Sequence, residues 1–163
     1  MNYLRTQFGF TLLELLIAIA LVGILSSLAV PAFQETMARS RLTSATNLMV
    51  GSLNYAKSEA IDRQQLVIVR PVNDDWEDGW EVVADPGGGA EEQLKVYQSS
   101  ASSLSMTSTD DSFSFAATGF RDFGGNAAAA SNVLVEDTES DDQRRICVNI
   151  GGGVRVTQGE ACQ

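Results

Sequence analysis

A single charge interrupts the longest apolar run of the chain, and this combination limits what the segment can fold into. The run covers residues 10–30, and Glu14 is its only charged residue. About 20 apolar residues suffice for a helix to cross a bilayer, but a charge within the hydrocarbon costs on the order of 2.5–3.5 kcal/mol on insertion scales. The carboxylate therefore needs a partner from outside the segment, which indicates assembly with other molecules.

Two simpler interpretations of the apolar run stay open. An ordinary secretory signal peptide starts with a basic region, here Arg5, and residues 28–32 offer small side chains for cleavage. Its apolar core, however, is usually only about 7–15 residues long and seldom carries a glutamate. A plain single-span anchor is the other alternative. The length of the run and the presence of Glu14 favour a span that also takes part in assembly.

The composition indicates one small acidic domain behind this run. The chain has 163 residues and a net charge of −10. Residues 34–163 fall within the usual size range of a single domain. Because a surface this acidic repels phosphate backbones, nonspecific binding of nucleic acid is disfavoured for the domain as a whole.

The helix of the apolar run is predicted to continue into water, to about Asp62. Small and apolar residues recur there at steps of three and four, as expected for one buried helix face. Pro31 lacks a backbone donor and crowds the preceding turn, so we expect a bend or local melting at that point. The alternative is that Pro31 simply ends the span. The predicted buried stripe consists of Leu42, Ala45, Met49, Leu53, Ala56 and Ala60.

Beyond Asp62 the sequence changes to short β-type segments separated by turn-rich stretches. Their spacing predicts antiparallel sheets. The expected fold class is therefore α+β, with a long N-terminal helix, membrane-spanning in its first half, packed on a C-terminal antiparallel β domain. Loops are expected at residues 73–79, 85–89 and 124–131, and a tight turn at 151–153. Strands are expected at 66–69, 80–83, 94–97, 113–115, 133–135, 146–150 and 154–156.

The chain has two cysteines, Cys147 and Cys162, both near the C-terminus. Two cysteines in an exported protein commonly form a disulfide, and closing a loop of this length is worth about 3 kcal/mol in the chain-entropy model. Two free thiols are the alternative. A zinc site is disfavoured because the chain contains no histidine to complete the ligand set.

Gly9, Phe10, Thr11 and Glu14 together resemble the prepilin cleavage and methylation signal of type IV pilins and type II secretion pseudopilins. The resemblance implies that residues 1–9 are a leader, that prepilin peptidase cuts after Gly9, and that the new amine of Phe10 is methylated. It also implies that Glu14 pairs with the N-terminal ammonium of a neighbouring subunit, which supplies the counter-charge.

The resemblance also concerns the rest of the apolar helix. Residues 10–33 would form the transmembrane and assembly helix. A proline at the end of the apolar stretch recurs in the pilin helix, so Pro31 is expected to belong to this assembly segment.

Nearly the whole chain is similar to the FimT/GspH family of minor pilins and minor pseudopilins. Besides the N-terminal signal, the similarity rests on residues 55–60, 79–82, 113–119 and 146–156. It implies a β-sandwich-like pair of sheets packed on the helix. It further implies a subunit that is incorporated in a type IV pilus or primes its assembly, or a minor pseudopilin of a type II secretion system.

The same resemblance implies a location and partners. The expected location is the bacterial inner membrane, crossed once, with the globular domain in the periplasm, and a pilus or pseudopilus after assembly. The expected partners are other major and minor pilin or pseudopilin subunits, the prepilin peptidase and inner-membrane lipid.

A DNA-binding role, as in DNA-uptake pilins, is a weaker alternative. Relatives with that role carry a Gly-Arg-x-Arg motif in the last hairpin, whereas residues 152–155 have glycine in place of the first arginine. Arg155 remains, and Arg144 and Arg145 are candidates to lie near it. Three cations in so acidic a chain make a weak electrostatic footprint, so DNA is not an expected partner.

Catalysis, cofactors and metals have little support. The absence of histidine excludes Ser-His-Asp and Cys-His arrangements, and no enzyme activity, cofactor or metal is expected. Two acidic clusters, residues 74–78 and 136–142, could attract calcium, but neither has EF-hand spacing and charge runs are usually solvated. Trp76 and Trp80 are expected to be packing residues rather than a recognition surface.

Overall fold

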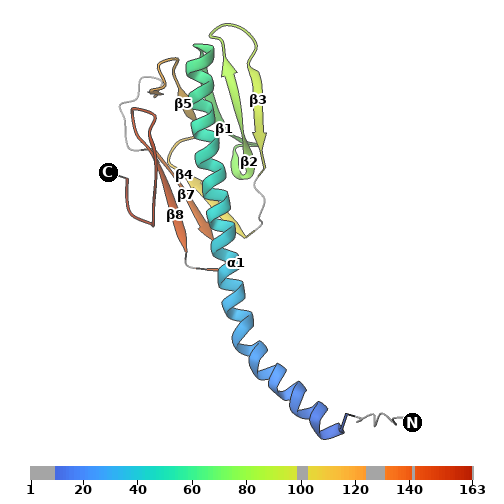
Figure 1. Ribbon diagram of the computed structural model, residues 1–163. Helices are drawn as coiled ribbons and strands as arrows, with labels where there is room; N and C mark the ends of the chain where they lie inside the picture. The colour runs from blue at the N-terminus through green and yellow to red at the C-terminus, as the bar shows by residue number, and fades with distance from the viewer. Residues whose placement is uncertain (1–9, 99–102, 124–130, 141, 163) are drawn as a thin grey trace, which may run out of the picture. The chain divides into compact units, whose positions relative to one another are not determined.

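The computed structural model describes residues 10–98, 103–123, 131–140 and 142–162. The chain divides into two compact units, Met1–Met37 and Ala38–Gln163. One helix, α1 (Leu12–Arg63), contributes to both units (Figure 1). At 1.5 Å per residue its 52 residues are about 78 Å long.

In the first unit, α1 is helical through Pro31. The expected local melting is therefore absent, and the helix itself does not end at Pro31. The hydroxyl of Thr36 donates to the carbonyl oxygen of Ala32 at 2.9 Å, a bond within the helix just after the proline. A proline removes only one backbone donor from the ladder, and the remaining helical bonds keep the segment intact.

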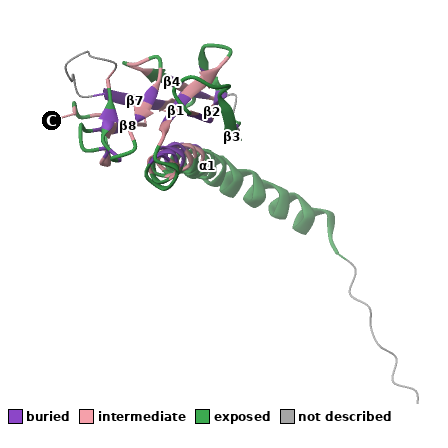
Figure 2. Cartoon of the chain, turned by 90° about the horizontal axis from the view of Figure 1, so that it is seen from above, coloured by how far each residue is buried: buried purple, intermediate pink, exposed green. Residues whose placement is uncertain are grey.

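In the second unit, α1 buries one face and exposes the other (Figure 2). The buried positions are spaced three and four residues apart, as one side of a 3.6-residue helix requires. They are Ala38, Leu42, Thr46, Met49, Ser52, Leu53, Ala56 and Ala60. This set includes the predicted stripe except for Ala45, which is half-buried.

The helix ends one residue from the predicted position. Gln64 adopts a left-handed conformation with φ 55°, and the N–H of Gln65 donates to the carbonyl oxygen of Ala60 at 3.3 Å. This six-to-one bond is the signature of a Schellman termination. It turns the chain directly into the first strand.

The first sheet has five antiparallel strands in the order β3-β2-β1-β5-β6. Strand β1 alternates, with Val67 and Val69 fully buried, because successive side chains of a strand point to opposite faces. The strands are β1 (Leu66–Val72), β2 (Asp75–Asp85), β3 (Glu92–Tyr97), β5 (Phe113–Phe115) and β6 (Arg121–Asp122).

The second sheet has four antiparallel strands in the order β4-β7-β8-β9. They are β4 (Leu104–Ser108), β7 (Ser131–Asp137), β8 (Gln143–Val148) and β9 (Val154–Thr157). The two sheets are joined where the N–H of Arg121 donates to the carbonyl oxygen of Ile150 at 2.9 Å. Glu77 of β2 adds a second link, because its carboxylate accepts a bond from the Ser105 hydroxyl of β4 at 2.8 Å.

The core lies between the buried face of α1 and the inner faces of both sheets. Trp80 is the largest fully buried side chain, and its ring stacks on Tyr97 with centroids 5.8 Å apart. Trp76 is also buried and meets the ring of Phe113 edge-on. Both tryptophans are therefore packing residues, as expected.

All seven predicted strands are present, but three expectations about the β region need correction. Residues 75–79 of the predicted loop belong to β2, and only Asn73 and Asp74 form the turn. Strands β4 and β6 were not predicted. The predicted strand 146–150 ends at Val148. The predicted loop 124–131 and the predicted leader 1–9 lie outside the described residues, except for Ser131, which begins β7.

Candidate assembly site

The first unit presents an uncovered apolar surface. Every described residue from Phe10 to Met37 is exposed, and α1 contains an 18-residue window with a mean hydropathy of 2.5. The helix is therefore long and apolar enough to cross a membrane. Its exposed large side chains include Phe10, Leu12, Leu13, Leu16, Ile17, Leu21, Ile24, Leu28 and Phe33.

Glu14 has a partner within its own chain. The backbone N–H of Glu14 donates to the hydroxyl oxygen of Thr11 at 3.2 Å, and the backbone N–H of Thr11 donates to the Glu14 carboxylate at 3.5 Å. Thr11 is thus the N-cap of α1 and Glu14 its third helical residue, which is a capping box. The carboxylate also lies where the helix dipole favours a negative charge.

Sequence reasoning missed this pairing, although the signal was present. The pattern Thr-x-x-Glu before an apolar run is the sequence signature of a capping box. Glu14 is still exposed, so its carboxylate can accept further bonds. Its pairing with the ammonium of a neighbouring subunit stays a prediction, as do the roles of Gly9 and Phe10 in processing.

The second unit ends in a braced hairpin. Cys147 of β8 is bonded to Cys162, with Cα atoms 5.6 Å apart, so the predicted disulfide is present. Lys57 of α1 donates from its Nζ to the carbonyl oxygens of Gly151 and Gly152, at 3.1 and 3.3 Å. Lys57 therefore holds the turn between β8 and β9 to the helix. The disulfide holds the C-terminal segment to β8.

The three arginines considered for DNA contact do not form one cluster. Arg145 and Cys147 are two residues apart on β8, and Cys147 pairs with Arg155 of β9. Arg145 and Arg155 therefore share the outer face of the second sheet, while Arg144 belongs to the opposite face. Arg145 already donates to the Asn132 side-chain oxygen at 2.8 Å, so only Arg155 of these three is uncommitted.

The second acidic cluster holds a hairpin to the helix. Arg39 pairs with Asp142 at 3.1 Å, and Arg41 pairs with Glu139 at 2.6 Å and with Asp137 at 3.4 Å. The carboxylates thus have protein partners. Within the described residues, no group of three or more His, Cys, Asp or Glu side chains is placed to hold a metal ion.

The pKa values of Glu81 and Arg121, two of the charged residues of the first sheet, are shifted from their ordinary values. Hydrogen bonds donated by Gln93 and Arg70 lower the pKa of the Glu81 carboxyl. Burial lowers the pKa of the Arg121 guanidinium, and the carboxylate of Asp110 offsets this effect in part. The Arg121 guanidinium lies over the rings of Phe113 and Phe123, at 4.8 and 4.7 Å from their centroids. These cation–π contacts stabilise the edge of the core.

An exposed apolar helix with a capped acid at its start, followed by an antiparallel β domain, defines a pilin-like protein. Residues 4–30 match the profile of the prokaryotic N-terminal methylation motif, in agreement with that class. Residues 45–152 match the profile described as type II transport protein GspH, and the chain belongs to this family.

Individual relatives agree with this assignment. Fimbrial protein EcpC of Eikenella corrodens is 51% identical over 47 residues, a match that covers 29% of this chain and 31% of that protein. This chain thus spans about a third of that relative. A fimbrial protein of Pseudomonas aeruginosa is 26% identical over 107 residues, covering 65% of this chain and 70% of that protein.

Solved structures show the same fold. The type IV minor pilin FimU of Pseudomonas aeruginosa superposes with a TM-score of 0.62 at 18% identity, covering 73% of this chain and 90% of that one. The minor pseudopilin EpsH from the type 2 secretion system of Vibrio cholerae superposes with a TM-score of 0.58 at 14% identity, covering 74% and 99%. The fold of this chain is therefore the one that these two proteins share.

Proposed function

We propose that the protein is a non-catalytic structural subunit that is cut after Gly9, methylated at Phe10, and incorporated in a type IV pilus or its priming complex. The observation that carries the proposal is the exposed apolar surface of residues 10–33, which has no cover within the described chain. Lipid covers it before assembly and other pilin-type helices cover it afterwards. The second unit, with its own core, would lie in the periplasm and select partners.

The mechanism is an exchange of lipid for protein around the helix. Acyl chains are as apolar as leucine, so helix association in a membrane depends on packing and on polar contacts rather than on hydrophobic burial. The capping bond from Thr11 satisfies only part of the Glu14 carboxylate. A neighbouring N-terminal ammonium would neutralise the charge and thereby favour the assembled state.

Processing is the direct test. Mass spectrometry of the protein extracted from membranes should find a chain that starts with methylated Phe10, and Gly9→Ala should leave the full precursor. Gly23→Ala is the matched control, because a methyl group at Gly23 meets no atom within 4 Å and lies far from the cleavage point. A mature chain that starts near residues 29–32 would instead identify an ordinary signal peptide.

A minor pseudopilin of a type II secretion system is the second candidate. The family match to a type II transport protein and the fold shared with EpsH favour it. Isolation of the protein from membranes under mild conditions, followed by identification of its companion subunits, distinguishes the two systems. Companions from a secretion system would replace the pilus assignment but not the assembly mechanism.

A further inference from the structure

Arg155 is unusual among the cations of this acidic chain. Of the lysines and arginines that the structure describes, it is the one without an ion pair, a hydrogen bond or an aromatic ring contact. The chain carries 21 acidic residues, yet none of those described lies against this guanidinium. The charge is therefore available to a ligand.

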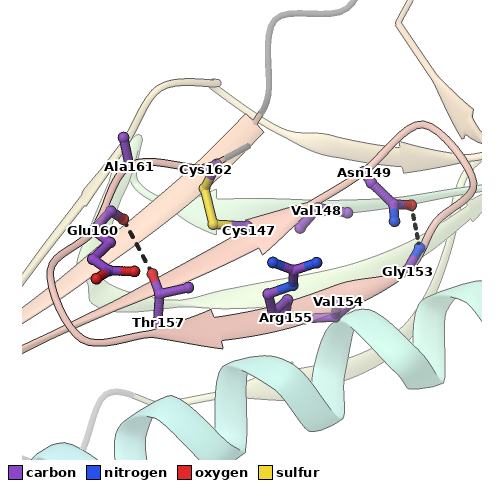
Figure 3. A pocket seen from close by; sticks show the side chains of 10 residues that line it. All are labelled: Cys147, Val148, Asn149, Gly153, Val154, Arg155, Thr157, Glu160, Ala161 and Cys162. Atoms are coloured by element: carbon purple, nitrogen blue, oxygen red, sulfur yellow. Dashed lines mark hydrogen bonds between the residues drawn. A yellow bond between two sulfur atoms is a disulfide. The ribbon is translucent and has the colours of Figure 1, made fainter.

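The side chain of Arg155 stands in a hollow of about 370 Å³ beside the disulfide (Figure 3). Asn149 and Gly153 bound the hollow at the turn, and Thr157 and Glu160 bound it at the opposite end. The apolar part of its lining on the face of Arg155 is Ala161 and the Cys147–Cys162 bridge, whereas the side chains of Val148 and Val154 belong to the core side of the sheet. An accessible cation thus stands in a hollow that has both polar and apolar walls.

These walls are held in place by the protein itself. The side-chain oxygen of Asn149 accepts a bond from the Gly153 N–H at 2.8 Å, which fixes the turn. The hydroxyl of Thr157 donates to the carbonyl oxygen of Glu160 at 3.1 Å, which fixes the path of the chain towards Cys162. A site formed in advance binds with a smaller loss of conformational entropy.

The charge pattern selects the ligand. A polyanion such as DNA gains affinity from several neutralised phosphates, but Arg145 is engaged by Asn132, so the hollow offers one uncommitted cation rather than several. A single carboxylate needs only one cation, and the planar guanidinium can bind it with two parallel hydrogen bonds. An aliphatic stem behind that carboxylate would fill the apolar part of the hollow.

We infer that this hollow binds one carboxylate, carried on an aliphatic stem, from a neighbouring pilin-type subunit. The identity of the partner rests on the proposed function, whereas the chemistry of the ligand does not. The hollow would then act as a contact through which the β domain recognises one neighbour.

The ligand chemistry can be measured on the full chain in detergent micelles, uniformly labelled with 15N. Titration with sodium pentanoate should shift the Arg155 Nε–H signal saturably, and sodium chloride at equal ionic strength should not. The signal is assigned by its loss in Arg155→Lys. Arg155→Gln should abolish pentanoate-dependent shifts of the Ala161 amide, and Arg144→Gln, on the other face, should retain them.

Two results of this titration overturn the inference. One is the absence of saturation with pentanoate. The other is a larger response to inorganic phosphate or to a short single-stranded DNA, which would identify a site for phosphates.

The partner is tested in cells with a photo-crosslinking side chain at Ala161, and at the exposed Asn54 of α1 as a control position. We expect a crosslink from position 161 to an acidic segment of a pilin-type subunit, lost in Arg155→Gln and kept in Arg144→Gln. Crosslinks to a peptide without a carboxylate, or to a protein of another class, overturn the partner assignment. Failure of the proposed function has a different readout from these crosslinks: mass spectrometry would find a protein that retains residues 1–9.

Discussion

The indole N–H of Trp80 donates to the hydroxyl oxygen of Ser52 at 2.8 Å, and both side chains are fully buried. This bond joins strand β2 of the first sheet to α1 inside a largely apolar core. Ser52 in turn donates to the carbonyl oxygen of Met49 at 2.8 Å. Ser52 thus supplies the hydrogen-bond acceptor that the indole N–H of the buried Trp80 needs.

Ser52→Ala should therefore destabilise the second unit. The substitution leaves the buried Trp80 N–H without an acceptor, which costs about 1–3 kcal/mol. Denaturant unfolding of the full chain in detergent, followed by tryptophan fluorescence, measures the change. Ser58→Ala, at an exposed position of the same helix, should stay within about 0.5 kcal/mol of the wild type. Equal effects of the two substitutions would contradict a role for the bond.

Gly152→Ala should disturb the junction between the last hairpin and the β5–β6 turn. A Cβ atom at this position would lie against the carbonyl oxygen of Gly119, and φ is +69°. Strain of this kind costs on the order of 1–3 kcal/mol. Gly51→Ala is the matched control, since its Cβ meets nothing within 4 Å and alanine favours a helix by up to about 1 kcal/mol. The two substitutions should shift the unfolding midpoint in opposite directions.

The Glu81 carboxyl should make stability depend on pH in the acid range. Because its pKa is lowered in the folded state by bonds from Gln93 and Arg70, its contribution is complete above the unfolded value of about 4.3. It is lost as the pH falls through the lower folded value. Glu81→Gln should thus cost less than about 1 kcal/mol at neutral pH, and the difference from wild type should shrink in acid.

Unfolding at neutral pH and at about pH 3 tests this prediction. Glu92→Gln, whose side chain is 63% exposed in its pair with Arg63, should have a smaller effect at neutral pH. A stability difference between Glu81→Gln and wild type that is the same at both pH values would exclude the linkage.

Glu14→Ala should permit normal cleavage and reduce assembly, because the carboxylate is needed after processing rather than during it. Thr11→Ala removes only the capping contact, at about 1 kcal/mol, and keeps the charge, so filaments should still form. Yields of sheared filaments, together with the mass of the mature chain, separate the two effects. An unchanged yield for Glu14→Ala would argue against charge pairing between subunits.

The helix and most strands could be predicted because their patterns are local. Val67 and Val69 alternate with half-buried residues in β1, and the stripe from Leu42 to Ala60 keeps its spacing over several turns. Strand β4 was missed because only Leu104 and Met106 are apolar in a serine-rich stretch. Its pairing with β7, which is distant in sequence, stabilises it instead.

The acidic segment after Val72 shows the opposite limitation. Its composition is typical of a loop, yet the turn needs only Asn73 and Asp74, both with positive φ. The following residues extend β2 so that Trp76 enters the core while its acidic neighbours face solvent. The partners of Arg145 and the freedom of Arg155 depend on strand register, which no local pattern specifies.

The ion pairs between α1 and the β7–β8 turn have a consequence for how the protein responds to its surroundings. Arg39 and Asp142 are well exposed, whereas the side chain of Asp137, which pairs with Arg41, is inaccessible. Dissolved ions weaken exposed pairs much more than buried ones. A rise in ionic strength should therefore first weaken the contact between α1 and the β7–β8 turn, as a local opening. The core around the two tryptophans should stay folded.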